Sequence, residues 1–338
     1  MVDPQKNSFD LLRLFAAALV LYSHQHVLLG LVEPEFFGWN SFGGVGVSIF
    51  FFLSGHLVWS SWARDPDLKR FFTRRSLRIF PALWFVVLLS VMVLGPIVTK
   101  LAVPDYLTSA GTWRYLSTML LVVRQGLPGV FVDNPYPNAL NGSLWTLPVE
   151  FLCYVSVATT GCISLVQRNW LMALCLGLTV VVAAYGSLIF GARYTPHLEM
   201  VSLFWWGVMY GYVRARPATE STGWAIVMIV ALLAFLLLGA RGLERTGILV
   251  SAAALVMTAQ RAPWGAWLTD RLGDLSYGMY IFAFPVQQIV VSLGRHRDWS
   301  FATHLGLSLL VTSVLAYVSW HVIEQRALRF KPKSRAVA

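Results

Sequence analysis

Long apolar stretches alternate with short polar segments along the whole chain. Each apolar stretch has roughly 16 to 23 residues, close to the length that an α-helix needs to cross a bilayer. The pattern therefore predicts an all-α, polytopic integral membrane helix bundle of about ten transmembrane helices. The stretches lie near residues 9–30, 42–62, 79–98, 143–166, 170–190, 198–213, 222–240, 246–260, 275–294 and 301–323.

The segment TWRYLSTMLLVV, residues 112–123, is too short for a further span and precedes a polar, proline-rich segment. We expect it to be interfacial or re-entrant. An eleventh span here would move every later loop across the membrane, including the basic C-terminal tail. Basic residues concentrate on the cytoplasmic side of membrane proteins. The ten-span arrangement with both termini cytoplasmic is therefore preferred.

The composition supports a membrane protein. Of the 338 residues, 57% are hydrophobic and 12% charged, whereas a soluble domain is about 25% charged. The net charge of +10 comes from short basic clusters between apolar runs, as cytoplasmic anchoring charges do, which argues against nucleic-acid binding. We predict a single transmembrane domain over residues 1–338, without an appended soluble domain, in the bacterial inner (cytoplasmic) membrane.

Arg13 and His24 are the first candidates for chemistry. They are eleven residues apart in one apolar segment, which on a helix is roughly three turns plus 20°, so both project from one face about 16 Å apart. Taken singly, a snorkelling arginine and a satisfied core histidine are the alternatives. Together they favour a polar, functional face.

Arg75 and Arg78 belong to the basic segment KRFFTRRSLRIFP, which we expect at the cytoplasmic surface just before the third helix. One interpretation is membrane anchoring by positive charge. The other is a phosphate clamp, because two arginines three residues apart share a face of a helical turn and form forked hydrogen bonds with phosphates.

Glu150, in NGSLWTLPVEFLCY, lies inside the fourth span, about seven residues from its outer end. A carboxylate at that depth is costly unless it is paired or faces a wet cavity. His24 has a similar depth, so the two side chains are expected to meet, and a histidine held by a carboxylate can act as a general base. Pairing of Glu150 with another polar group is the alternative.

Weaker candidates remain. The glycines of GGVGVSIFFFLSGH indicate close helix packing, with Ser54 and His56 as candidate polar lining. Glu324 and Arg326 are expected to form a structural ion pair. His321 and Glu324 have a spacing that metal sites use, but no further ligands accompany them, so no metal site is predicted. The cysteines (Cys153, Cys162 and Cys175) lie in apolar runs and predict neither a disulfide framework nor a metal site.

Six segments, in order from end to end, resemble the membrane-bound acyltransferase-3 family. They are FDLLRLFAAALVLYSH, GVSIFFFLSG, RRSLRIFP, SLWTLPVEFLCY, LGDLSYGMYIFAFPV and HVIEQRALR. One departure is visible, because Ala283 stands where the family's late motif usually has a histidine.

The resemblance implies an acetyl-CoA-dependent O-acetyltransferase that modifies a carbohydrate such as a cell-envelope polysaccharide or a secreted or lipid-linked oligosaccharide. It assigns Arg13, Arg75 and Arg78 to donor binding and His24 and Glu150 to catalysis. His24, oriented by Glu150, would deprotonate the acceptor hydroxyl. Direct transfer and a covalent acetyl-histidine both stay open.

Two other classes of protein are compatible with buried charges in a helix bundle. A transporter or flippase for a lipid-linked or anionic small molecule places such charges on its translocation path, but the chain lacks an inverted repeat and paired broken helices. A non-catalytic membrane sensor of an acyl donor is the second rival. The oligomeric state has no signature in the sequence.

Overall fold

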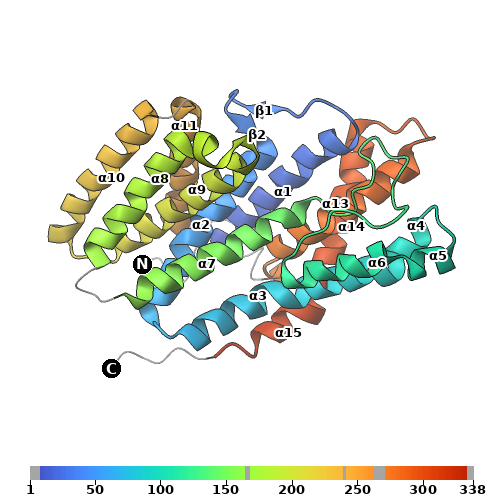
Figure 1. Ribbon diagram of the computed structural model, residues 1–338, viewed down its shortest axis with the longest axis horizontal. Coiled ribbons are helices and arrows are strands. Elements are labelled where there is room, and N and C mark those ends of the chain that lie inside the picture. Colours follow the sequence, from blue (N-terminus) through green and yellow to red (C-terminus); the bar gives the residue numbers. More distant parts are fainter. Residues whose placement is uncertain (1–7, 164–167, 239–240, 262–270, 333–338) are drawn as a thin grey trace.

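The computed structural model describes residues 8–163, 168–238, 241–261 and 271–332, and it is a helix bundle (Figure 1). Within the described residues, each of the ten predicted apolar stretches overlaps a long helix; residues 164–166 and 239–240 of two stretches lie outside them. These helices are α1 (Phe9–Leu28), α2 (Phe42–Arg64), α3 (Leu68–Leu89), α7 (Thr146–Cys162), α8 (Arg168–Phe190), α9 (Thr195–Arg214), α10 (Ala218–Leu238), α11 (Gly242–Arg261), α13 (Ser276–Gly294) and α14 (Phe301–Ser319).

Seven spans in the described part of the chain are long and apolar enough to cross a membrane, and eight if the bent α8 is one span. This supports an integral membrane protein. Short elements fill the connections: β1 (Glu35–Phe36) pairs antiparallel with β2 (Asn40–Ser41). The others are η1 (Ser90–Leu94), α4 (Gly95–Val98), α5 (Val103–Thr108), α6 (Ala110–Arg114), η2 (Tyr115–Leu120), η3 (Ser143–Trp145), η4 (Ala192–Tyr194), η5 (Trp320–Glu324) and α15 (Gln325–Leu328).

Helix α2 lies at the centre of the bundle, between α1, α9 and α7, and is the element on which both cavities described below are built. Its glycines allow close approach, as predicted. A Cβ atom at Gly55 would collide with the backbone of Phe204 in α9, and one at Gly207 would collide with the backbone of Phe52. Gly46 packs in the same way against the backbone of Ala16 in α1. Larger side chains at these positions would push the helices apart.

The basic segment differs from its prediction, because it lies on α3 itself and not before it. The helix begins at Leu68, where the Asp67 side chain accepts a hydrogen bond from the backbone of Arg70 at 2.8 Å. Asp65 accepts further hydrogen bonds from Arg70 and Arg74, and these hold the pKa of Asp65 well below its usual value. Asp65 offsets one of the two positive charges, which weakens the repulsion between Arg70 and Arg74 on one helix.

The segment between η2 and α7 enters the bundle and packs against α13. Asn134 donates to the side-chain oxygen of Gln288 at 2.7 Å, and Gln288 donates to the carbonyl of Ala139 at 2.7 Å. Asn141 donates to the carbonyl of Ile281 at 2.9 Å. These side chains satisfy backbone groups that a buried loop would otherwise leave unpaired. As a result, α7 begins at Thr146 inside the bundle, and the stretch 112–123 forms no span of its own.

Candidate active site

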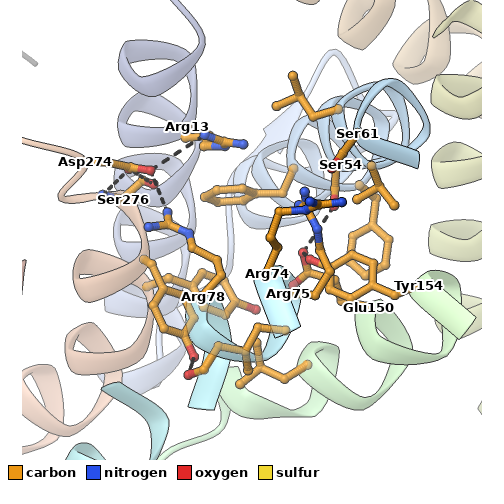
Figure 2. Close-up of a pocket in the computed structure, with 18 of the residues that line it drawn as sticks. Arg13, Ser54, Ser61, Arg74, Arg75, Arg78, Glu150, Tyr154, Asp274 and Ser276 are labelled. Atoms are coloured by element: carbon orange, nitrogen blue, oxygen red, sulfur yellow. Dashed lines mark hydrogen bonds and ion pairs between the residues drawn. The ribbon is translucent and has the colours of Figure 1, made fainter. Parts of the chain in front are cut away.

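A polar cavity of about 420 Å³ lies at the end of the bundle where α1 begins and α2 ends. Four of the five predicted site residues line it: Arg13 from α1, Arg75 and Arg78 from α3, and Glu150 from α7. We call it the inner cavity. Its arginines form two groups on different sides of the pocket (Figure 2).

Asp274, just before α13, organises the first group. It accepts a 2.6 Å ion-paired hydrogen bond from Arg78 and lies 3.6 Å from a guanidinium nitrogen of Arg13. Arg13 also donates to Asp10 at 2.8 Å, and the Ser276 backbone donates to Asp274. Burial opposes ionisation of Asp274, but the arginines outweigh it and lower the pKa of this carboxyl. Asp274 therefore stays charged and fixes both arginines at the cavity wall.

Glu324 completes the surroundings of Arg78. It lies in η5, a π-helical turn at the end of α14, accepts a hydrogen bond from Ser319 at 3.0 Å and lies 3.6 Å from Arg78. The predicted pairing of Glu324 with Arg326 is therefore wrong. The Glu324 side chain is 3% exposed and turned toward Arg78, whereas Arg326 is exposed, and residues two apart do not face each other on a helical turn.

Arg74 and Arg75 form the second group, beside Ser54 and Glu150 (Figure 2). The guanidinium of Arg75 lies 5.8 Å from the ring centre of Tyr154, and its buried Nε has no hydrogen-bond partner in the described structure. Arg74 donates to Asp65 at 2.7 Å, but its Nε and one Nη are likewise buried and unpartnered among the described residues. Buried guanidinium donors without acceptors are costly, so this wall is suited to an anionic ligand.

Glu150 does not meet His24, contrary to the prediction. It accepts hydrogen bonds from Ser54 at 3.2 Å and from Tyr154, and it lines the inner cavity whereas His24 does not. The prediction that Glu150 and His24 lie at equal depth assumed that the fourth span meets the outer membrane surface at residue 143. Because the segment before α7 enters the bundle, Glu150 lies deeper than the residue count implied.

His24 lines a second cavity of about 450 Å³, which we call the outer cavity. It lies where α1 ends and α2, α9 and α11 begin, so the two cavities approach from opposite ends of the bundle. The His24 ring packs edge-on against Phe284 with centroids 5.4 Å apart, and its buried Nδ1 has no partner among the described residues. The lining of this cavity mixes apolar side chains, among them Val20, Leu203 and Ile248, with the polar and aromatic side chains of Glu33, Asn40, Trp145, Glu199 and Arg245.

Lys331 is a cavity residue that the sequence analysis missed. It follows α15 and lines the inner cavity with the arginines. Partial burial, together with the charges of Arg78, Arg75 and Arg13, lowers the pKa of Lys331 to about 8. Lys331 lies in a basic segment and Asp274 in a polar one. No sequence pattern distinguishes either residue from an ordinary surface charge.

The remaining candidates divide between lining and packing. Ser54 lines the inner cavity, but His56 is buried between Phe9 and Tyr210 and lines neither cavity. Ala283 packs in a small apolar cluster between α1, α13 and α14. No group of three or more His, Cys, Asp or Glu side chains suited to a metal ion occurs in the described residues.

Comparison with known proteins adds independent information. The acyltransferase domain family matches residues 6–321. An O-acetyl transferase of Shigella phage Sf6 is 30% identical over 97% of this chain and 98% of its own length. Nodulation protein 10 of Rhizobium leguminosarum is 31% identical over 96% of this chain and 94% of its own length. The peptidoglycan O-acetyltransferase OatA of Listeria monocytogenes is 23% identical over 94% of this chain and 55% of its own length. No solved structure matches.

Proposed function

The chain belongs to this acyltransferase family and is an acyltransferase, and from that premise we propose that it moves an acetyl group from cytoplasmic acetyl-CoA to a hydroxyl of a carbohydrate. Cell-envelope polysaccharide and secreted or lipid-linked oligosaccharide are the acceptor classes. The names of relatives that transfer O-acetyl groups, one of them to peptidoglycan, support this acceptor chemistry.

The observation that carries the proposal is the convergence of basic side chains on the inner cavity, among them Arg13, Arg74, Arg75, Arg78 and Lys331. Coenzyme A is a polyanion, and forked guanidinium donors fit its diphosphate and ribose phosphate. Arg13 and Arg78 face the same space. The donor site proposed on Arg13, Arg75 and Arg78 therefore gains Arg74 and Lys331.

We assign the chemistry to His24 as general base. Its neutral ring takes the proton of the acceptor hydroxyl as the oxygen attacks the thioester carbonyl, the carbon–sulfur bond breaks, and the departing thiolate of coenzyme A receives the proton. The outer cavity, with its Trp145 ring and its carboxylates Glu33 and Glu199, offers the hydrogen-bonding and stacking groups that a sugar uses. Glu150 then acts at a distance from His24, by balancing Arg75 and holding Tyr154.

For the topology we propose ten spans with both termini cytoplasmic in a bacterial inner membrane. Of the three helices that fall outside or at the margin of the hydropathy test, α8 and α9 run alongside α10, whereas α7 starts inside the bundle and ends beside Trp62 of α2. This places the inner cavity on the cytoplasmic side, where acetyl-CoA is made available.

The direct test uses purified protein in lipid nanodiscs, radiolabelled acetyl-CoA and carbohydrate extracted from the cell envelope of the bacterium that encodes the protein. Wild-type protein is expected to give base-labile label on the carbohydrate. The Arg75→Ala variant should raise the KM for acetyl-CoA about tenfold, because it removes a charge-assisted hydrogen bond, with kcat little changed, because phosphate contacts persist into the transition state. Lost turnover at unchanged KM would contradict the clamp, and binding of coenzyme A without any transfer would favour a sensor.

A pH effect follows from Lys331. Below pH about 8 this side chain is charged and adds to donor binding, and above that pH it loses its proton. The phosphates of coenzyme A are already ionised, since a phosphate monoester has its second pKa near about 6. Affinity for coenzyme A, measured by calorimetry, should therefore fall about two- to fivefold from pH 7 to pH 9, the size of a partly exposed ion pair. Lys331→Arg should remove the pH dependence while keeping the affinity. An equally steep profile in Lys331→Arg would exclude this residue as its source.

A further inference from the structure

The inner and outer cavities meet at two side chains. Val47 of α2 and Tyr280 of α13 are the residues that line both cavities among those described. Each is only 8% exposed, so they form the boundary between the arginine-lined space and the His24-lined space.

Both sides of this boundary are rigid. The Tyr280 hydroxyl is 2.7 Å from the Thr146 hydroxyl and donates to the Ser143 carbonyl at 2.9 Å, and its ring packs edge-on against Phe50 with centroids 5.8 Å apart. Val47 is β-branched and lies within a helix, where one side-chain rotamer predominates. The gap between them is therefore set by side-chain size and not by side-chain rearrangement.

Because Val47 and Tyr280 border both cavities, the route from the donor site to His24 that the structure offers passes this boundary. The phosphates stay on the arginines of the inner cavity, and the acyl carbon must come within reach of a hydroxyl activated in the outer cavity. On the inner face of the boundary, Val47 and Phe50 give an apolar surface beside the paired hydroxyls of Thr146 and Tyr280. This surface suits a methyl group and does not suit a charged one.

Resting on the proposed function, we propose that Val47, which borders both cavities together with the fixed Tyr280, is a specificity-determining residue that restricts transfer to short acyl groups. A longer acyl chain would need the volume that the two γ-methyl groups of Val47 occupy. One methylene in a tight apolar site changes discrimination by roughly 10- to 200-fold, so a single valine is sufficient to separate acetyl from propionyl donors.

The experiment compares labelled acetyl-CoA with labelled propionyl-CoA in nanodiscs, with the same carbohydrate extract as acceptor. Val47→Ala is expected to raise the propionyl-to-acetyl ratio of kcat/KM by about tenfold. Val47→Ile, which adds one methylene, should lower acetyl transfer while affinity for coenzyme A is kept. If Val47→Ala does not fold, Val47→Ile tests the same boundary from the opposite direction.

The matched control is Val45→Ala. Val45 is a buried valine of the same helix, 6% exposed, that lines neither cavity, so it reports on loss of packing alone. The inference is overturned if the propionyl-to-acetyl ratio of kcat/KM is unchanged in Val47→Ala, or if Val45→Ala raises it equally. Undiminished acetyl transfer by Val47→Ile also overturns it. Wild-type protein that labels no carbohydrate refutes the proposed function, whereas an unaffected ratio in active protein refutes only this selection of the acyl group.

Discussion

Replacing His24 with glutamine is expected to lower acetyl transfer by roughly 10²–10⁴-fold, the range for a lost general base. Glutamine keeps a polar side chain of similar reach but does not titrate near neutrality. His24 lines the outer cavity and not the inner one, so affinity for coenzyme A should be retained. Transfer is measured with labelled acetyl-CoA, and donor binding is measured by calorimetry.

His56→Gln is the matched control for this variant. His56 is also a histidine in a central helix with a buried, unpartnered Nδ1, but it lines neither cavity. Its replacement should leave transfer close to the wild-type rate. Near-normal transfer by a well-folded His24→Gln protein would refute the catalytic role. Loss of donor binding alone would make His24 a binding residue.

Arg78→Ala should destabilise the protein by about 3 kcal/mol. Removing one partner of a buried ion pair costs about 3–5 kcal/mol because the other charge is left uncompensated. The side chains of Asp274 and Glu324 are 10% and 3% exposed, and both would lose Arg78. We take the lower end of the range because Arg13 remains 3.6 Å from Asp274. The measurement is denaturant unfolding of the purified protein in detergent.

Two further variants make this result specific. Arg329→Ala removes an exposed arginine near the same end of the bundle, and it should change stability by less than about 0.5 kcal/mol. Adding Glu324→Gln to Arg78→Ala removes the buried carboxylate that loses its arginine and should restore part of the loss. Equal effects of Arg78→Ala and Arg329→Ala would show that the network around Asp274 contributes little to stability.

Helical periodicity predicted much of this molecule. In the described part of the chain the ten apolar stretches overlap ten long helices, and the Arg13–His24 face of α1 does connect two cavities, since one residue lines each. Both inferences depend only on rise and rotation per residue, which are properties of the local chain. Arg75 and Arg78 were likewise found from local spacing and charge.

The partners of these residues could not be found in the same way. Asp274 is separated from Arg78 by 196 residues, and no local pattern marks that contact. The predicted meeting of His24 and Glu150 was wrong because it depended on where α7 starts relative to the membrane. That position is set by side-chain hydrogen bonds such as those of Asn134 and Asn141, which hold a polar segment inside the bundle.

The narrow boundary at Val47 and Tyr280 also has an electrical consequence. In the proposed topology the two cavities would approach from the two faces of the membrane and carry the potential of each aqueous compartment inward. The voltage difference would then fall mainly across the short stretch between them. Moving one elementary charge through 100 mV corresponds to about 2.3 kcal/mol. A proton held on His24 lies beside this stretch, whereas the phosphates of a donor on the arginines lie on its other side. The two halves of the reaction would therefore take place at different electrostatic potentials.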